Sequence, residues 1–345
     1  MNNSASFFSP LVMTALITIL TGCAGPGPDD DRPDWIGGNS KTYPTEHYLI
    51  GRGEAEHAAV ARDRARADLA KIFEVSISEQ SRDITEYSRT TGSGEQTQSS
   101  LETAISRQIA TRTDQTLSHI EIAEIWQDPD SGRHHALAVL DRLKAGQQLR
   151  DSIRQLDDLT GKVIEEARQQ SELLRQLARA NRAVETQLQR RALQRQLQVI
   201  DPAGTGVPSR YRLEKLLTDR NNLAQRVRIR THIDQDASGQ LPTIINGALA
   251  EAGFLQVDDD ANYRLDASLD LTPFPDQQWH WVHGNLTIVL RSLSNKSVQG
   301  SHRWEIKQAA SQPLLARQRA LQSLNDRLNN ELRDVIIGFA EARKK

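Results

Sequence analysis

The residue with the most specific chemistry is Cys23, the only cysteine in the chain. It directly follows Leu20, Thr21 and Gly22. Small residues before a peptide bond let a peptidase bring its active site against the backbone, and a cysteine after that bond supplies a thiolate that can carry a diacylglycerol. A lone cysteine rules out a disulfide framework, a zinc site with several cysteines and a cysteine redox pair. We therefore predict that Cys23 is lipidated, with acyl chains such as palmitate.

The segment before Cys23 is typical of an export signal. Its unbroken apolar part, from Leu11 to Leu20, is about 10 residues long, which suits a signal peptide and is too short to span a bilayer. With the residues at 20–23 it resembles the lipobox of bacterial lipoproteins, so residues 1–22 are predicted to be a lipoprotein signal peptide. The alternative is a buried N-terminal helix with an incidental cysteine. Ala24 follows the cysteine, and resemblance to Gram-negative lipoproteins then implies a lipid anchor at the periplasmic face of the outer membrane.

Two acidic segments have the residue types of a cation site. Residues 234–239 match the first half of an EF-hand loop, but the ninth position is Pro242 and the twelfth is Ile245, where a bidentate Glu is required. Asp258, Asp259 and Asp260 form a like-charge run, which is typical of a solvated turn. We expect both segments to be loops and predict no bound metal.

Histidine pairs give no stronger signal. A strand would place His280 and His283 on opposite faces, and neither these two nor the pair His134 and His135 has carboxylate or cysteine company at ligand spacing. The sequence contains no Gly-x-Ser-x-Gly, Ser-x-x-Lys or His-Glu-x-x-His motif. We predict no catalytic residue and no cofactor, and expect that the protein is not an enzyme.

Glycine and tryptophan residues supply two further candidates. Gly51-Arg52-Gly53 could begin a phosphate cradle, but the third glycine of the dinucleotide fingerprint is replaced by Glu56, so a turn leading into a helix is expected. Trp279, Trp281 and Trp304 could form an aromatic patch on one sheet. Packing in the core or at an edge is the default for these rings, and a patch that faces a partner remains open.

Composition bounds the class of protein. The chain has 345 residues, 26% of them charged, with a net charge of −2, so a polycation that coats nucleic acid is excluded. Arg190, Arg191 and Arg195 are expected on a solvated helix face, and no nucleic acid partner is predicted. Only one stretch of the sequence, before residue 25, is long and apolar, so a protein with several membrane spans is excluded.

A first folded block is expected after a Gly/Pro-rich acidic tether over residues 23–42. Ala61, Ala65 and Leu69 recur at helical spacing after a short strand at 48–50, and small residues let such a helix lie close to a sheet. The other expected elements are strands at 74–78, 83–87, 120–126 and 136–140, a helix at 97–113 and a hairpin turn at 127–132. Residues 43–141 are therefore predicted to be an α+β domain.

Three motifs in this block resemble the LPP20 family of bacterial lipoproteins. They are Pro33-Asp34-Trp35, the Gly51-x-Gly53 motif and the Ala- and Arg-rich run at 61–70. The resemblance extends from the lipobox at about residue 20 to residue 141. It implies a non-enzymatic envelope lipoprotein, of a kind that includes flagellar basal components and surface antigens, and it carries over no catalytic residue.

Residues 142–200 carry a heptad pattern without a proline, which predicts a long helix or coiled-coil segment. A continuous helix of about 55 residues would reach ~80 Å, and Gly161 could kink or divide it. Asn181 at an inward position would fix the register of a pairing. The helix could pair between chains as an oligomerising or spacing device, or it could pack along its own chain, and the sequence leaves both possibilities open.

The last block follows a linker at 201–208. Helix patterns at 210–225, 241–252 and 313–342 alternate with strand patterns at 227–231, 263–271, 281–293 and 298–307. Residues 209–345 are therefore predicted to be a C-terminal α+β domain with one antiparallel sheet backed by helices. At the level of fold alone this block resembles the small α/β domains of curli-secretion and penicillin-binding-protein activator lipoproteins.

The sequence thus predicts an α+β protein with two small sheet-and-helix domains separated by a long heptad-patterned helical segment. The expected function is a non-enzymatic periplasmic scaffold or assembly component of an envelope structure, such as a flagellar basal structure. The alternative is a regulatory lipoprotein that binds a peptidoglycan synthase or a secretion complex through its C-terminal domain. The expected partners are the membrane, through the lipid anchor, and envelope proteins. A homo-oligomer is a further possibility that the sequence leaves open.

Overall fold

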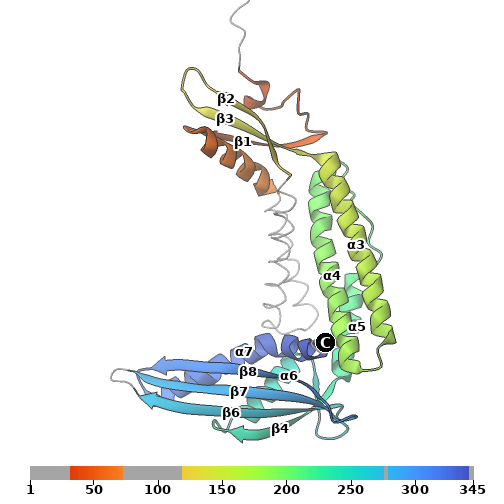
Figure 1. The fold of residues 1–345 in the computed structure, drawn as a ribbon, viewed down its shortest axis with the longest axis vertical. Helices are drawn as coiled ribbons and strands as arrows, with labels where there is room; N and C mark the ends of the chain where they lie inside the picture. The colour runs from red at the N-terminus through yellow and green to blue at the C-terminus, as the bar shows by residue number, and fades with distance from the viewer. Residues whose placement is uncertain (1–31, 73–118, 276–278, 342–345) are drawn as a thin grey trace, which may run out of the picture.

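The structure, a computed structural model, describes residues 32–72, 119–275 and 279–341. The lipobox at 20–23 and the elements expected at 74–78, 83–87 and 97–113 lie outside these residues. Two units that each combine a sheet with helices are joined by a pair of long helices (Figure 1). The expected α+β class is therefore observed in the described part of the chain.

The first unit contains a three-stranded antiparallel sheet in the order β1-β3-β2. Its strands are β1 (Tyr48–Ala55), β2 (Glu121–Gln127) and β3 (His134–Asp141), with Gly132 at φ 69° in the β2–β3 turn. A helix at 58–72 buries Ala61, Ala65 and Leu69 against one face of the sheet. The small residues allow this close approach, as the helical spacing predicts.

The chain enters this unit earlier than the predicted end of the tether at residue 42. A single 3-10 turn, η1 (Asp34–Ile36), places Trp35 against Leu137 and Val139 on the other face of the sheet. The Asp34 carboxylate accepts a hydrogen bond from the Lys41 backbone amide at 2.8 Å, so the following segment is also held. Burial of the Trp35 ring therefore holds this Pro- and Gly-rich segment against the sheet, although its composition is typical of a flexible tether.

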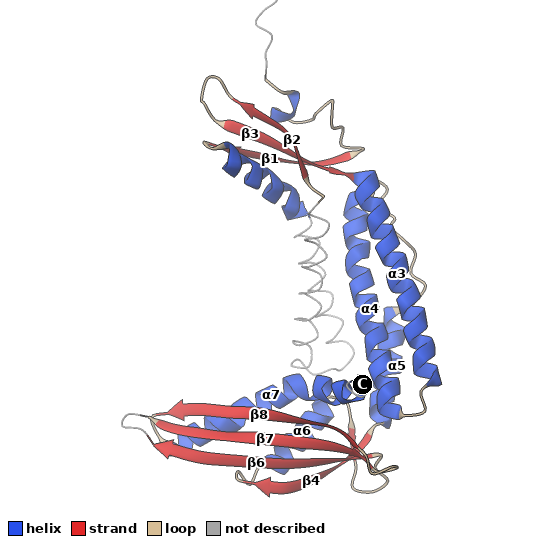
Figure 2. Ribbon diagram, in the orientation of Figure 1, coloured by secondary structure: helices blue, strands red, loops and turns tan. Residues whose placement is uncertain are grey.

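The middle block forms a helical hairpin instead of one continuous helix. Its arms are α3 (Arg142–Gln169) and α4 (Leu173–Ile200), which lie antiparallel (Figures 1 and 2). The break is at 170–172 rather than at Gly161, because the Glu172 side chain caps α4 by accepting from the backbone amides of Leu174 and Arg175. Most of the heptad positions are buried within the chain, where they pair the two arms or enter the neighbouring cores.

Arg190 is expected on a solvated helix face, but it lies in a buried polar layer inside the hairpin. The buried Asp157 carboxylate accepts from Gln187 at 3.1 Å and lies 3.3 Å from the Nε of Arg190, which is itself buried. Arg190 also donates to the Val207 carbonyl at 2.7 Å. Asn181 bonds to Glu185 one turn later on its own helix, so it does not fix a pairing between helices.

The second unit contains a five-stranded sheet in the order β5-β4-β6-β7-β8. Its strands are β4 (Arg228–Asp236), β5 (Leu255–Gln256), β6 (Tyr263–Pro275), β7 (His280–Ser292) and β8 (Val298–Ala310). The sheet is mixed, which corrects the antiparallel prediction: β4 runs parallel to β5 and β6. The cause is α6 (Leu241–Glu251), which returns the chain so that β6 points the same way as β4.

Helices α6 and α7 (Pro313–Glu341) cover one face of this sheet (Figure 2). Helix α5 (Leu213–Arg226) instead lies along α4, where Leu213 and Leu217 pack against Val184 and Leu188. We call α3, α4 and α5 together the spacer. It therefore includes residues 213–226, which the sequence assigns to the C-terminal domain.

The spacer is embedded in the core of each unit. At one end, Ile153, Leu197 and Ile200 share the core of the first sheet; at the other, Leu174 and Leu177 share the core of the second. Arg142 ties the first junction together by donating to the carbonyl of Thr45 at 2.8 Å and to that of Ile200 at 2.7 Å. Among the described residues, no helix is both long enough and apolar enough to cross a membrane.

Candidate functional site: the open face of the C-terminal sheet

Trp35 is a structural anchor of the first unit. Only 2% of it is exposed, and its indole Nε1 donates to the Glu124 Oε2 at 2.6 Å. Pro33 precedes the 3-10 turn, and Asp34 holds the segment that follows it. This motif therefore joins the start of the described chain to β2 and β3.

Gly51 and Gly53 lie within β1, so the predicted turn is wrong. An added Cβ at Gly51 would lie 2.4 Å from the Ala65 carbonyl oxygen, and one at Gly53 would lie 2.1 Å from the Ala61 carbonyl oxygen. No side chain fits between the strand and the helix at 58–72. The glycines are needed for close packing, which is a frequent reason for glycine inside a strand.

The acidic candidates for a cation site have local structural roles. Asp236 accepts from the backbone amides of Ser238 at 2.8 Å and Leu241 at 3.1 Å, and so shapes the turn between β4 and α6. Asp260 has a positive φ of 56° and pairs with Arg228. Within residues 32–72, 119–275 and 279–341, no three His, Cys, Asp or Glu residues gather closely enough to hold a metal ion.

The tryptophans do not share one environment. Trp304 is fully buried beneath α7, where its Nε1 donates to the Glu331 Oε2 at 2.6 Å. Trp281 lies on the opposite face of the sheet, and Trp279 just before β7 is 47% exposed. The face that carries Trp281 is not covered by α6 or α7, and we call it the open face.

An aromatic cluster occupies one end of the open face. Phe274 on β6 is 63% exposed and lies directly opposite Trp281 in the β6–β7 register. The His283 ring is centred 6.3 Å from the Phe274 ring and 6.0 Å from the Trp281 ring. The Lys307 Nζ lies 5.4 Å from the centre of the Trp281 ring, within cation–π range. Exposed rings beside a cation are typical of the anchoring part of an interface.

A charged cluster occupies the other end of this face. The buried Asp266 carboxylate lies between two arginines, with Oδ1 2.6 Å from the Nε of Arg264 and Oδ2 2.8 Å from the Nε of Arg291. Burial opposes ionisation of Asp266, but the two guanidinium groups outweigh it and hold the pKa of Asp266 below its usual value. None of the candidate residues predicted from the sequence lies in this cluster, although the alternation at 263–269 places Arg264 and Asp266 on one face.

A polar row joins the two ends. The Asp270 carboxylate accepts from the Asn285 backbone amide at 3.0 Å, and the Asn285 side chain accepts from the Nε of Arg303 at 2.8 Å. These contacts cross β6, β7 and β8, so they fix the side chains of the open face to a rigid sheet. Such a surface is suited to contact with a partner.

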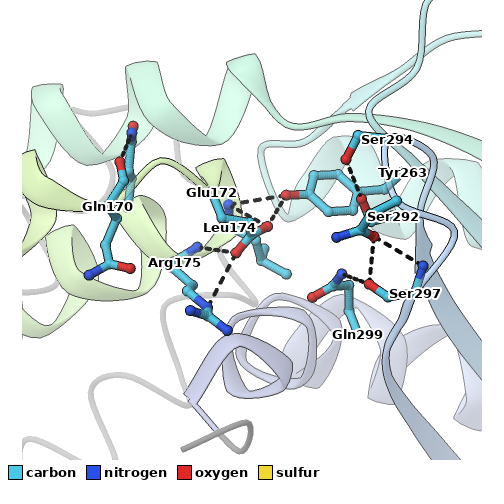
Figure 3. Close-up of polar contacts among 11 residues, drawn as sticks. Gln170, Glu172, Leu174, Arg175, Tyr263, Ser292, Ser294, Ser297 and Gln299 are labelled. Atoms are coloured by element: carbon cyan, nitrogen blue, oxygen red, sulfur yellow. Dashed lines mark hydrogen bonds and ion pairs between the residues drawn. The ribbon is translucent and has the colours of Figure 1, made fainter.

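The open face is also fixed relative to the spacer. The Tyr263 hydroxyl, at the start of β6, donates to the Glu172 carboxylate and accepts from the Leu174 backbone amide at 3.2 Å (Figure 3). Burial and the neighbouring carboxylate raise the pKa of Tyr263, so the phenol keeps the proton that it donates. The turn between β7 and β8 lies beside this joint and is held by the bond from Gln299 to Ser297 at 2.9 Å.

Comparisons with known proteins identify the first unit. The family model described as LPP20 lipoprotein matches residues 33–141, in agreement with the predicted resemblance. No curated protein matches the sequence. The match indicates a lipoprotein of the cell envelope.

Solved structures show weaker similarity. The secreted protein HP1454 from Helicobacter pylori is 13% identical with a TM-score of 0.40, over 86% of this chain and 99% of that chain. A minor lipoprotein from Acinetobacter baumannii is 10% identical with a TM-score of 0.25, over 34% of this chain and 92% of that one. Rare lipoprotein B from Shewanella oneidensis is 16% identical with a TM-score of 0.22, over 33% and 94%. No functional conclusion follows from similarities of this size.

Proposed function

We propose that this LPP20-containing lipoprotein is a non-enzymatic scaffold, anchored through Cys23 at the periplasmic face of the outer membrane. The observation that carries the proposal is the spacer, whose ends are embedded in the cores of both units. Each arm has 28 residues, which corresponds to roughly 42 Å of helix. The lipid-anchored unit and the open face are therefore held at a fixed separation, which is what an assembly component must provide.

The open face is the proposed contact with an envelope protein. Its aromatic cluster would supply buried contact area, and the Arg264–Asp266–Arg291 cluster would supply charge-based selectivity. A flagellar basal structure or a similar envelope assembly fits a scaffold of this kind. Neither nucleic acid nor a cofactor has a role in this proposal.

A regulatory lipoprotein is the second candidate. In this reading the C-terminal unit would bind a peptidoglycan synthase or a secretion complex, and the position of the open face in that unit favours it. The two candidates differ in stoichiometry: a scaffold is present in several copies in one assembly, whereas a regulator acts as a monomer or dimer.

Site-specific photo-crosslinking in living cells tests the proposal. A photoreactive residue at Ser301 or Thr272, both on the open face, should capture a defined envelope protein together with several copies of this chain. The matched control is Asp151 on the exposed side of α3, which should capture neither. Capture of a single wall synthase at low stoichiometry would support the regulator, and equal capture from Asp151 would contradict a role for the open face.

The anchor is tested separately by Cys23→Ser. This variant should lose the lipid label and leave the outer-membrane fraction. Crosslinking from Ser301 should fall with it, since an unanchored chain is no longer held beside its partner. Retention of the variant in the outer membrane would contradict anchoring through Cys23.

A further inference from the structure

A groove of about 720 Å³ lies between the helices of the spacer. Its floor is Ala180 and Ala183 on α4, and its walls include Ile164 on α3 and Leu216 on α5. Small floor residues leave space above α4 that longer side chains would fill. The volume is within the range of roughly 300–1,000 Å³ that is typical of pockets for small organic ligands.

Gly161 and Tyr211 line the groove side by side. Tyr211 packs so tightly over Gly161 that a Cβ on the glycine would lie 2.6 Å from the tyrosine hydroxyl. Gly161, expected from the sequence to kink or divide a helix, thus makes room for this ring. This tight contact fixes the Tyr211 ring as part of the groove wall.

The rim of the groove is cationic. Arg168, Arg210, Arg212 and Lys215 surround it, and Asp219 is the only acidic side chain among its lining residues. Arg210 pairs with Asp158 at 3.2 Å, Lys215 with Asp219 at 3.6 Å and Arg168 with Glu165 at 3.6 Å, all on the exposed surface. Exposed pairs of this kind are weak and can be exchanged for a better anion.

We propose that this groove binds a single-chain lipid with an anionic head, such as a long-chain fatty acid. The alkyl chain lies on the alanine floor between α3 and α5, and the carboxylate lies among the rim cations. The lining residues include four cations and one acid, so an anionic head group fits the rim better than a neutral one.

Binding of palmitate to the full-length Cys23→Ser chain, which lacks acyl groups of its own, tests the proposal. Titration calorimetry and native mass spectrometry should show one saturable site. Ala180→Phe fills the floor and should weaken binding about tenfold or more. Gln155→Phe, on the exposed surface of α3 outside the groove, is the matched control and should bind palmitate as the parent does.

The head group is tested by comparing palmitate with the neutral alcohol of the same length. Arg212→Ala should weaken palmitate binding up to about fivefold, the range of an exposed ion pair, and leave alcohol binding unchanged. Arg154→Ala, an exposed arginine on α3 that is not at the rim, is the control.

Four results would overturn the proposal. The first three are the absence of saturable palmitate binding, unchanged binding in a folded Ala180→Phe chain, and alcohol binding as tight as that of palmitate. A fourth is capture of a polypeptide by a photoreactive group at Leu216 that palmitate does not compete away, which would assign the groove to a partner segment.

Discussion

Single residues determine how closely the elements of the first unit approach one another. Gly51 and Gly53 have no side chain where β1 meets the backbone of the helix at 58–72. Trp35 packs on the other face of the same sheet. The LPP20 motif residues at these positions hold the fold together. Because these residues pack within the unit, their substitution should act on stability first.

Gly53→Ala should destabilise the protein by about 3 kcal/mol, because the added methyl group overlaps the backbone at Ala61 and Ala65. Arg52→Ala, between the two glycines and exposed, is the matched control and should change stability by less than about 0.5 kcal/mol. Urea denaturation measures both. Equal midpoints for the two variants would show that the helix does not pack on β1 as described.

Asp266 should make stability depend on acid pH. Its pKa is lower in the folded protein than in the unfolded chain, so its contribution is complete above the ordinary pKa and is lost as pH falls through the folded value. Asp266→Asn should cost about 2 kcal/mol near pH 7, and its stability should fall less on acidification than that of the parent. Denaturation series between pH 7 and about pH 3 measure this, with the exposed Asp151→Asn as control. Parallel pH profiles for parent and Asp266→Asn would contradict the arginine clamp.

Residue-level prediction succeeded where a residue type has one physical use. Apolar alternation predicted β6 and the spacing of Leu321, Leu324 and Leu328 predicted the buried side of α7. The role of Gly51 and Gly53 could not be predicted, because a glycine pair suits a turn as well as a strand covered by a helix. The open face needed the register of three strands before Phe274, Trp281 and Lys307 could be brought together.

At the scale of elements, the heptad pattern indicated the apolar side of α3 and α4 but not the partner of that side. The same spacing serves a continuous coiled coil and a hairpin, and three residues at 170–172 decide between them. The parallel pairing of β4 and β6 was missed for a similar reason. A strand pattern indicates which face is buried, and it does not indicate the direction of the neighbouring strand.

The joint between hairpin and sheet should behave as one coupled unit. Tyr263→Phe removes the hydroxyl that both donates to Glu172 and accepts from Leu174, and should cost about 1–2 kcal/mol. Glu172→Gln should cost a similar amount, since it weakens the same bond and the cap of α4. The double variant should cost less than the sum of the two, as a double-mutant cycle measures. Additive costs would contradict a direct bond between these side chains.

Strand β8 is an edge strand that α7 protects. Arg327 donates to the Glu305 carbonyl at 2.8 Å and Arg319 donates to the Ala309 carbonyl at 3.0 Å, so two carbonyls that could pair with another strand are occupied. The double variant Arg319→Ala, Arg327→Ala should self-associate more strongly in sedimentation velocity runs. Arg317→Ala, which removes an arginine of α7 that bonds to Ala237 instead, is the control. A double variant that sediments like the control would show that these arginines do not guard the edge.

At the scale of the whole molecule, the spacer joins the two units into one structure. Its apolar sides are used within the chain and the β8 edge is covered, so a higher-order assembly would need other surfaces, of which the open face is the best candidate. The lipid anchor would then set where the protein is, and the spacer would set where the open face points.

The most direct test of this account is a distance distribution between the two units, measured by pulsed electron paramagnetic resonance. Replacing Cys23 with Ser leaves a chain without cysteine, so spin labels can be placed at Arg62→Cys in the first unit and Ser301→Cys on the open face. The account predicts one narrow distance that does not change when labelled protein is diluted with unlabelled chain. A broad distribution would contradict a rigid spacer, and loss of the distance on dilution would show that it is measured between two chains instead of within one.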